Sequence, residues 1–405
     1  MGSPVHGSRS LPSQPITSPP PGSLHFLNLL ATSLVAVSGD PCGVKSDAYS
    51  FSEISRFGEG SPRALWQNRP TETLALVSEG HDTAPAIAAC TGEPIADVGS
   101  RLQALADVGV LRPDGGGRYR LGVVLLTEDR AALYMPVRLA LLTQTVRAVD
   151  RFIAREPALR QGRLAGYSLL THSNVPLDSY VINDVEDALF GDVRPERGGG
   201  RFWAALFHRP GWRVEDGTKT EGIYGNSVSV YGAVAVNAYS NRERSGHALR
   251  QFGREDLGLD SSAPQDAAVV ALKRLAESYA RFALEGAAPD PHHGDLLRRV
   301  GWISDAGAPT ALVLTHDENR ALEEAALRFV PDLAAIVRAE LPFLRAVYDA
   351  SPYADEVSFP EYVLFWYHVF YSRVTDALVA TEVSSASPSS GGHVEYLVLP
   401  EGWAP

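Results

Sequence analysis

Residues 102–122 read LQALADVGVLRPDGGGRYRLG and combine a helix end, two short strands and a glycine-rich turn. Apolar residues recur at spacings of three and four from Ile95 to Val108, which is the pattern of an amphipathic helix. Gly109 predicts the end of that helix, because glycine readily adopts the left-handed conformation that follows many helix C-termini. The three glycines 115–117 then permit a tight turn between VLRP and RYRL. The stretch therefore predicts a helix that leads into a two-stranded hairpin.

Two further short helices are expected before this stretch. TETLALVSEG at 71–80 and TAPAIAACTG at 83–92 each end in a glycine, and Pro94 suits the first turn of the next helix. The order of three helices and a hairpin over residues 70–135 resembles the winged helix of ArsR/MarR-type transcriptional regulators, with LQALADVGVLRP as its most specific segment. The resemblance implies a DNA-binding unit whose last helix enters the major groove while the hairpin, the wing, lies over the backbone.

The surface expected to face DNA is short of positive charge. Residues 71–126 hold four arginines against seven carboxylates, a net charge of −3, and the whole chain carries −12. Because phosphate binding depends on Lys and Arg, we expect modest affinity for DNA, raised in a homodimer that combines two half-sites. A winged helix used only for packing or dimerisation is the alternative. The residues expected to contact DNA are Ser100, Arg101, Gln103, Arg112, Arg118, Tyr119 and Arg120.

The whole chain predicts an α+β protein in which this N-terminal unit is fused to a larger mixed α/β domain. Residues 1–22 are rich in Pro, Ser and Gly and are expected to be a disordered tail, followed by a lead-in segment over 23–69. Within that segment, LHFLNLLATSLVAVSGDPC (24–42) has the features of a signal-peptide core, but the proline-rich tail before it favours a mistaken start codon or a buried first element. An effector or catalytic domain is expected over 136–400. Its strand-like runs are 167–175, 201–208, 227–240 and 393–400, and its helical runs are 265–285, 317–350 and 360–380, the last buried on all sides.

The larger domain holds a candidate for a second winged-helix-like unit, although no clean helix-turn-helix precedes it. The pattern L-x-x-x-G-V-L at 105–111 recurs as L-x-x-x-G-W-I at 297–303, and each segment runs on into a Leu-Thr pair. Thr315 and Glu318 have the spacing of a capping box, which explains the THDE segment at a strand-to-helix junction without catalysis. Tandem units are similar to those of winged-helix DNA glycosylases, but the Gln-x-Gln or Gln-x-Asp signature of that family is not visible at a corresponding position.

Polar aromatic side chains in the second half predict a small-molecule pocket. Strand alternation in the segment GIYGNSVSVYGAVAVNAYSNR gives Tyr231, Asn237 and Tyr239 the same parity, so one face could carry all three. Such groups commonly line ligand sites, and an exposed sheet surface is the alternative. The residues assigned to the pocket are Tyr224, Tyr231, Asn237, Tyr239, His368 and Tyr371.

Three residues are candidates for acid–base catalysis. Glu361 and His368 share one face of the helix expected over 360–380, and His172 follows a strand-like run. A lone histidine among aromatic residues is more often a hydrogen-bonded core residue, so the sequence favours a non-enzymatic role while leaving catalysis open.

Several enzyme classes are excluded by the motifs that the chain lacks. It has no Gly-x-Ser-x-Gly elbow, no Walker A loop and no Gly-x-Gly-x-x-Gly after a strand, and we expect no cofactor. Cys42 and Cys90 form no Cys-x-x-Cys pair, so we expect no metal site, while a disulfide between them stays open. So few cysteines favour a reducing cytoplasm, and no apolar run reaches the roughly 18–20 residues that a membrane span requires.

We therefore expect a cytoplasmic winged-helix transcriptional regulator that binds DNA and responds to a small organic ligand. The first alternative is a biosynthetic or hydrolytic enzyme that uses the winged helix as a scaffold or dimerisation element. The others are a DNA-processing enzyme with tandem winged helices and an interaction module whose wing binds a protein partner.

Overall fold

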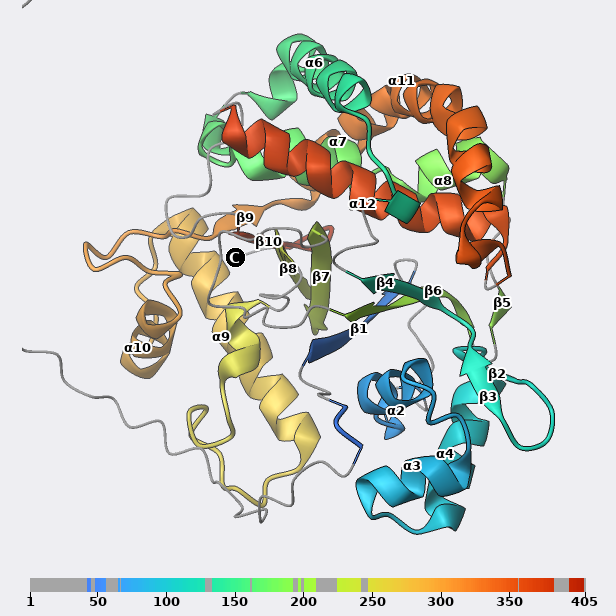
Figure 1. Ribbon diagram of the computed structural model, residues 1–405. Helices are drawn as coiled ribbons and strands as arrows, with labels where there is room; N and C mark the ends of the chain where they lie inside the picture. Colours follow the sequence, from blue (N-terminus) through green and yellow to red (C-terminus); the bar gives the residue numbers. More distant parts are fainter. Residues whose placement is uncertain are drawn as a thin grey trace, which may run out of the picture.

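The computed structural model describes residues 42–44, 48–55, 65, 67–127, 133–160, 162–191, 196–197, 200–208, 224–241, 247–355, 357–381 and 393–403. These residues form an α+β structure in which two four-stranded sheets lie beside a layer of helices (Figure 1). The expected tail over 1–22 and the apolar run up to residue 41 fall outside the described residues. Within the part of the chain described, no helix is both long enough and apolar enough to cross a bilayer.

Three helices pack together on the N-terminal side of the molecule. They are α2 (Pro70–Ser78), α3 (Ala84–Thr91) and α4 (Ile95–Asp107). Thr83 caps α3 by accepting a hydrogen bond from the backbone N–H of Ala86, and Gly92 follows α3 with a φ of 70°. The apolar faces of the three helices pack with Tyr49, Phe202 and Leu206 into one core, which we call the N-terminal core. The three predicted helices are thus confirmed.

A hairpin follows α4, as the glycine turn predicts. Strand β2 (Leu111–Pro113) pairs antiparallel with β3 (Tyr119–Leu121), and the chain then enters β4 (Val124–Thr127). Gly122 at this junction lies against the backbone, since a Cβ placed there would come within 2.6 Å of the carbonyl oxygen of Gly109. The base of the hairpin is therefore held tightly against the end of α4.

Two sheets form the centre of the molecule. The first has the order β1-β6-β4, with β5 paired to β6, and the second has the order β7-β8-β10-β9. In each sheet one edge pair is parallel, β4 with β6 and β9 with β10, and the other pairs are antiparallel. The strands are β1 (Tyr49–Ser55), β5 (Glu196–Arg197), β6 (Gly200–His208), β7 (Tyr224–Tyr231), β8 (Val234–Asn241), β9 (Leu312–Leu314) and β10 (His393–Val398).

A helical layer covers one side of both sheets, at the top of Figure 1. Its helices are α6 (Leu139–Arg155), α7 (Val175–Leu177), α8 (Ile182–Phe190), α11 (His316–Asp349) and α12 (Phe359–Ala380). Helix α12 is buried along almost its whole length, as expected, and it lies in the largest hydrophobic core. The capping box predicted from Thr315 and Glu318 is present at the start of α11, with both reciprocal hydrogen bonds.

Two further helices form a third core against the second sheet. They are α9 (Gln265–Glu285) and α10 (Pro291–Arg299), which pack with Val234, Val236 and Trp302. Short one-turn helices lie at Pro157–Leu159, Gly162–Gly166, Ala248–Gln251 and Pro352–Asp355.

The sequence pattern shared by 105–111 and 297–303 corresponds to a shared order of elements. Gly109 and Gly301 both end a helix with a φ of 73°. After α4 the chain forms the β2–β3 hairpin, and after α10 it forms a single antiparallel bridge between Ile303 and Pro309. Each segment then enters a strand that pairs in parallel with a strand from later in the chain. Whether the second segment is a winged helix stays a prediction.

The run 167–175, expected to be a strand, is helical. A π-helix (Leu170–Asn174) continues directly into α7. The apolar and β-branched residues of 167–175 have a strand-like composition. Almost all of them are buried, however, and they pack against helices α11 and α12 rather than in a sheet. Pro176 lies in this helical segment and, because it has no N–H, cannot donate a backbone hydrogen bond there.

Candidate functional site

The hairpin of β2 and β3 projects from the N-terminal helices into solvent (Figure 1). Its tip, residues 113–118, is exposed, and the three glycines at 115–117 all have positive φ. The base is fixed to the loop before α3: the backbone N–H of Tyr119 donates to the carbonyl oxygen of Asp82 at 2.8 Å, and Thr83 forms a bridge with Arg118. This geometry fixes the hairpin at Arg118 and Tyr119 and leaves residues 113–117 exposed.

Two of the predicted DNA-contacting arginines are exposed on this hairpin. Arg120 faces solvent, and the side chain of Arg118 is 63% exposed although its Nη2 lies 2.5 Å from Oδ2 of Asp82. An exposed ion pair contributes only about 0–1 kcal/mol, so a phosphate could displace Asp82 at little cost. Arg112 and Tyr119 are half-buried, and Tyr119 packs against the N-terminal core.

The expectation that Arg101 is exposed is wrong. The residue is only 9% exposed, and its guanidinium binds Glu93 through two hydrogen bonds, Nη1 to Oε1 at 3.0 Å and Nη2 to Oε2 at 2.6 Å. Arg101 follows Val98 by three residues and therefore lies on the buried stripe of α4. The hydrogen bonds from Arg101 lower the pKa of Glu93 to about 2. This ion pair connects the segment after α3 to α4. Because the Arg101 side chain is buried in the pair, it cannot contact DNA bases.

The other two predicted residues of α4 are on its exposed face. Ser100 donates a hydrogen bond to the carbonyl oxygen of Ala96 at 2.9 Å, and the Nε2 of Gln103 donates to Oδ1 of Asp107 at 2.7 Å. Both interactions are local and exposed, so both side chains could turn towards a partner.

Four of the predicted ligand-binding residues come together in the largest core. Tyr224, Tyr239, His368 and Tyr371 are all at least 97% buried there. The hydroxyl of Tyr371 donates to the carbonyl oxygen of Tyr224 at 2.6 Å, and the hydroxyl of Tyr239 lies 3.2 Å from Oγ1 of Thr375. These hydroxyl groups therefore bond to the protein itself.

The expectation of one shared face fails for Tyr231. A two-residue turn joins β7 to β8 and pairs Tyr231 with Val234, whose side chain lies in the third core. Asn237 and Tyr239, both on β8, have the opposite parity to Val234 and lie on the other face, as alternation within one strand requires. Tyr231 instead has its hydroxyl 3.2 Å from Nε2 of His247.

The three acid–base candidates lie on two helical segments: His172 is in the π-helix, and Glu361 and His368 are in α12. Nδ1 of His368 lies 2.7 Å from the carbonyl oxygen of Leu364, and Nδ1 of His172 lies 3.0 Å from that of Ser168. Burial lowers the pKa of His172. Glu361 lies in the first turn of α12 and is buried. Imidazoles bonded to their own helices are typical of structural histidines, and a catalytic role for these residues stays a prediction.

A cavity of about 260 Å³ lies between α2, β1 and β6, at a place that the sequence did not indicate. The hydroxyl of Tyr49 donates to Oε1 of Glu79 inside it, and the rings of Tyr49 and His208 stack with centroids 4.4 Å apart. Burial, and then the hydrogen bond to Glu79, raise the pKa of Tyr49 to about 12. The lining residues are Cys42, Gly43, Val44, Ala48, Tyr49, Glu79, His81 and His208.

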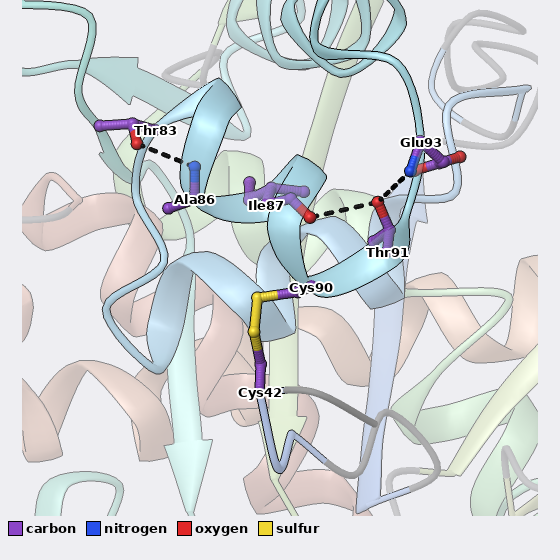
Figure 2. Close-up of a disulfide and its surroundings, with 7 residues drawn as sticks. All are labelled: Cys42, Thr83, Ala86, Ile87, Cys90, Thr91 and Glu93. Carbon is purple, nitrogen blue, oxygen red and sulfur yellow. Dashed lines mark hydrogen bonds between the residues drawn. A yellow bond between two sulfur atoms is a disulfide. The ribbon is translucent and has the colours of Figure 1, made fainter. Parts of the chain in front are cut away.

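Cys42 at this cavity forms a disulfide with Cys90 on α3 (Figure 2). One ring nitrogen of His81 and the two sulfur atoms all lie within 4.8 Å of one another. Two thiolates and an imidazole are ligands that zinc accepts, but sulfurs joined to each other are not thiolates. This group could therefore hold a metal ion only after reduction.

The sequence held one weak signal for this site. With only two cysteines in 405 residues, a disulfide between them was the one pairing available. The histidines at 81 and 208 are far apart in the chain, and only the packing of α2 against β1 and β6 brings them to the disulfide.

Comparison of the chain with models of protein families, with curated proteins and with solved structures finds no match.

Proposed function

We propose that residues 70–127 form a winged helix that binds DNA and that the protein is a transcriptional regulator. The observation that carries the proposal is the hairpin of β2 and β3, whose tip stands clear of the molecule with exposed Arg118 and Arg120 beside it. In such units the wing contacts the DNA backbone while the last helix presents short polar side chains to base edges. Ser100 and Gln103 on α4 are the exposed residues of this kind.

Because Arg101 is paired with Glu93, two exposed arginines, Arg118 and Arg120, remain for phosphate contacts in each unit, and Arg118 must first leave Asp82. The affinity of one unit is then low, and we propose a homodimer in which two units bind DNA together.

The proposed compartment is the cytoplasm, where the disulfide at Cys42 and Cys90 would meet reducing conditions. We place the ligand response at the cavity beside this disulfide, because the buried tyrosine hydroxyls of the largest core bond to the protein itself.

The test is a gel shift with DNA from the region upstream of the gene, at several salt concentrations. The double variant R118A/R120A should weaken binding and reduce the slope of log affinity against log salt by up to about 1.8 per subunit, at about 0.9 for each lost phosphate contact. The matched control is R147A/R151A, which removes the same charge from exposed positions on α6. No binding by the unchanged protein at low salt, or an equal loss in both variants, would refute the proposal.

A further inference from the structure

The two sulfur atoms of the disulfide have very different surroundings. Cys42 is partly exposed and lines the cavity of about 260 Å³. Cys90 is 8% exposed and belongs to the N-terminal core. Thiol–disulfide exchange requires the attacking thiolate to approach one sulfur along the axis of the bond, so access decides which sulfur is attacked. A molecule in the cavity meets Cys42 and not Cys90.

The cavity also contains a group suited to the departing sulfur. The ring nitrogen of His81 lies within 4.8 Å of both sulfur atoms, and His81 belongs to the loop between α2 and α3. An imidazole N–H close to a leaving thiolate stabilises it by hydrogen bonding and can supply its proton. Glu79, the carboxylate in the same cavity, is bonded to the hydroxyl of Tyr49.

We propose that this cavity is a site for a low-molecular-weight thiol, which exchanges with the disulfide and forms a mixed disulfide with Cys42. The thiolate of the small molecule attacks Sγ of Cys42, the bond between the two cysteines breaks, and Sγ of Cys90 leaves as a thiolate that takes up a proton. A second small thiol attacks the sulfur of the first, releases Cys42 and yields the oxidised dimer of the small thiol. Two electrons pass from the two small thiols to the protein disulfide. At about 260 Å³ the cavity is just below the roughly 300–1,000 Å³ typical of sites for drug-sized ligands, which suits a smaller thiol.

The released cysteine lies where α3 meets α4. Thr91, the next residue, donates a hydrogen bond to the carbonyl oxygen of Ile87 and accepts one from the backbone N–H of Glu93 (Figure 2). Glu93 in turn holds Arg101 of α4. Loss of the disulfide therefore removes a covalent constraint from the C-terminal end of α3. That end is connected through Glu93 to α4, the helix proposed to enter DNA. This regulatory consequence rests on the proposed function, whereas the exchange reaction does not.

The test uses the oxidised full-length protein and reduced glutathione as the probe. The reaction is stopped with acid, free thiols are alkylated, and peptides are mapped by mass spectrometry. We expect the glutathionyl group on Cys42 and the alkyl group on Cys90, with at least a tenfold excess over the opposite arrangement. Adducts on Cys90, an even distribution, or reaction only after denaturant is added would overturn the proposal.

A variant series tests the role of His81 as a positioning residue. H81Q should slow the exchange several-fold at an unchanged melting temperature, whereas H292Q, at an exposed histidine on α10, should leave the rate unchanged. If H81Q fails to fold, the mapping on the unchanged protein still decides the proposal.

Gel shifts of the oxidised and reduced protein separate the two proposals. Adducts on Cys42 without any DNA binding would leave the exchange site standing and refute the proposed function. DNA binding together with adducts on Cys90 would refute the exchange site at Cys42 and leave the proposed function standing.

Discussion

Removal of the disulfide should loosen the N-terminal helices much more than the rest of the protein. Cys42 and Cys90 are 48 residues apart, and closing a loop of that length removes about 14 cal/mol/K of entropy from the unfolded chain, or about 4 kcal/mol at 25 °C. The variant C42S/C90S should therefore lower the free energy of opening α2, α3 and α4 by about 4 kcal/mol. This corresponds to about a thousandfold faster exchange of their protected backbone amides.

Amide hydrogen exchange measures this effect segment by segment. The backbone N–H of Ile87, which donates to Thr83 at 3.0 Å within α3, is a suitable probe, and α12 in the separate largest core is the internal control. Reduced unchanged protein should behave like the variant, and reductant should have no effect on the variant itself. A change below about 1 kcal/mol in α3, or an equal change in α12, would refute the reasoning that the bond stabilises the N-terminal core specifically.

Three further predictions concern individual residues. The pKa of Glu93 is lowered to about 2, so its pairing with Arg101 stabilises the fold above the unfolded pKa of about 4.3, and this stability is lost as the pH falls towards 2. E93Q should lower the free energy of unfolding by roughly 2 kcal/mol at pH 7 and reduce its fall between pH 4 and 2, as measured by urea titrations; an unchanged fall would contradict this. Burial lowers the pKa of His247 to about 4, so the stability of the fold should decrease as the pH drops from about 6.5 through 4. H247Q should remove this contribution to the pH dependence of the melting temperature. T315A should destabilise the start of α11 by about 1 kcal/mol in denaturant titrations, whereas T315S, which keeps the capping hydroxyl, should not.

Local patterns were sufficient to predict elements whose signals lie within a few residues. The stripe from Ile95 to Val108, the positive-φ glycine at 109 and the glycines of the hairpin gave α4, β2 and β3 close to their observed bounds. The capping box of α11 and the buried character of α12 followed in the same way. In each case the residues that decide the conformation are neighbours in the chain.

Features that depend on distant partners could not be predicted. The burial of Arg101 depends on Glu93, which lies outside α4, and a charged residue in an apolar stripe gives no sign of its partner. The helical state of 170–177 depends on the helices packed around it, which override a strand-like composition. The cavity at Cys42 combines residues 42–44, 48–49, 79, 81 and 208, and no pattern within any one of these segments indicates the others.

The sheet that contains β6 couples the proposed DNA-binding unit to the rest of the molecule. Phe202 and Leu206 lie in the N-terminal core, whereas Ala205 and Phe207 lie in the largest core, as the alternation of side chains along one strand requires. The same strand pairs with β1, which follows Cys42, and with β4, which follows the hairpin. A unit that shares its core with this sheet and continues into β4 has little freedom to turn as a separate domain. A change at the disulfide can therefore reach the hairpin only by loosening the N-terminal core, and not by rigid reorientation. It follows that any difference in DNA binding between the oxidised and reduced protein should be accompanied by faster amide exchange in α3.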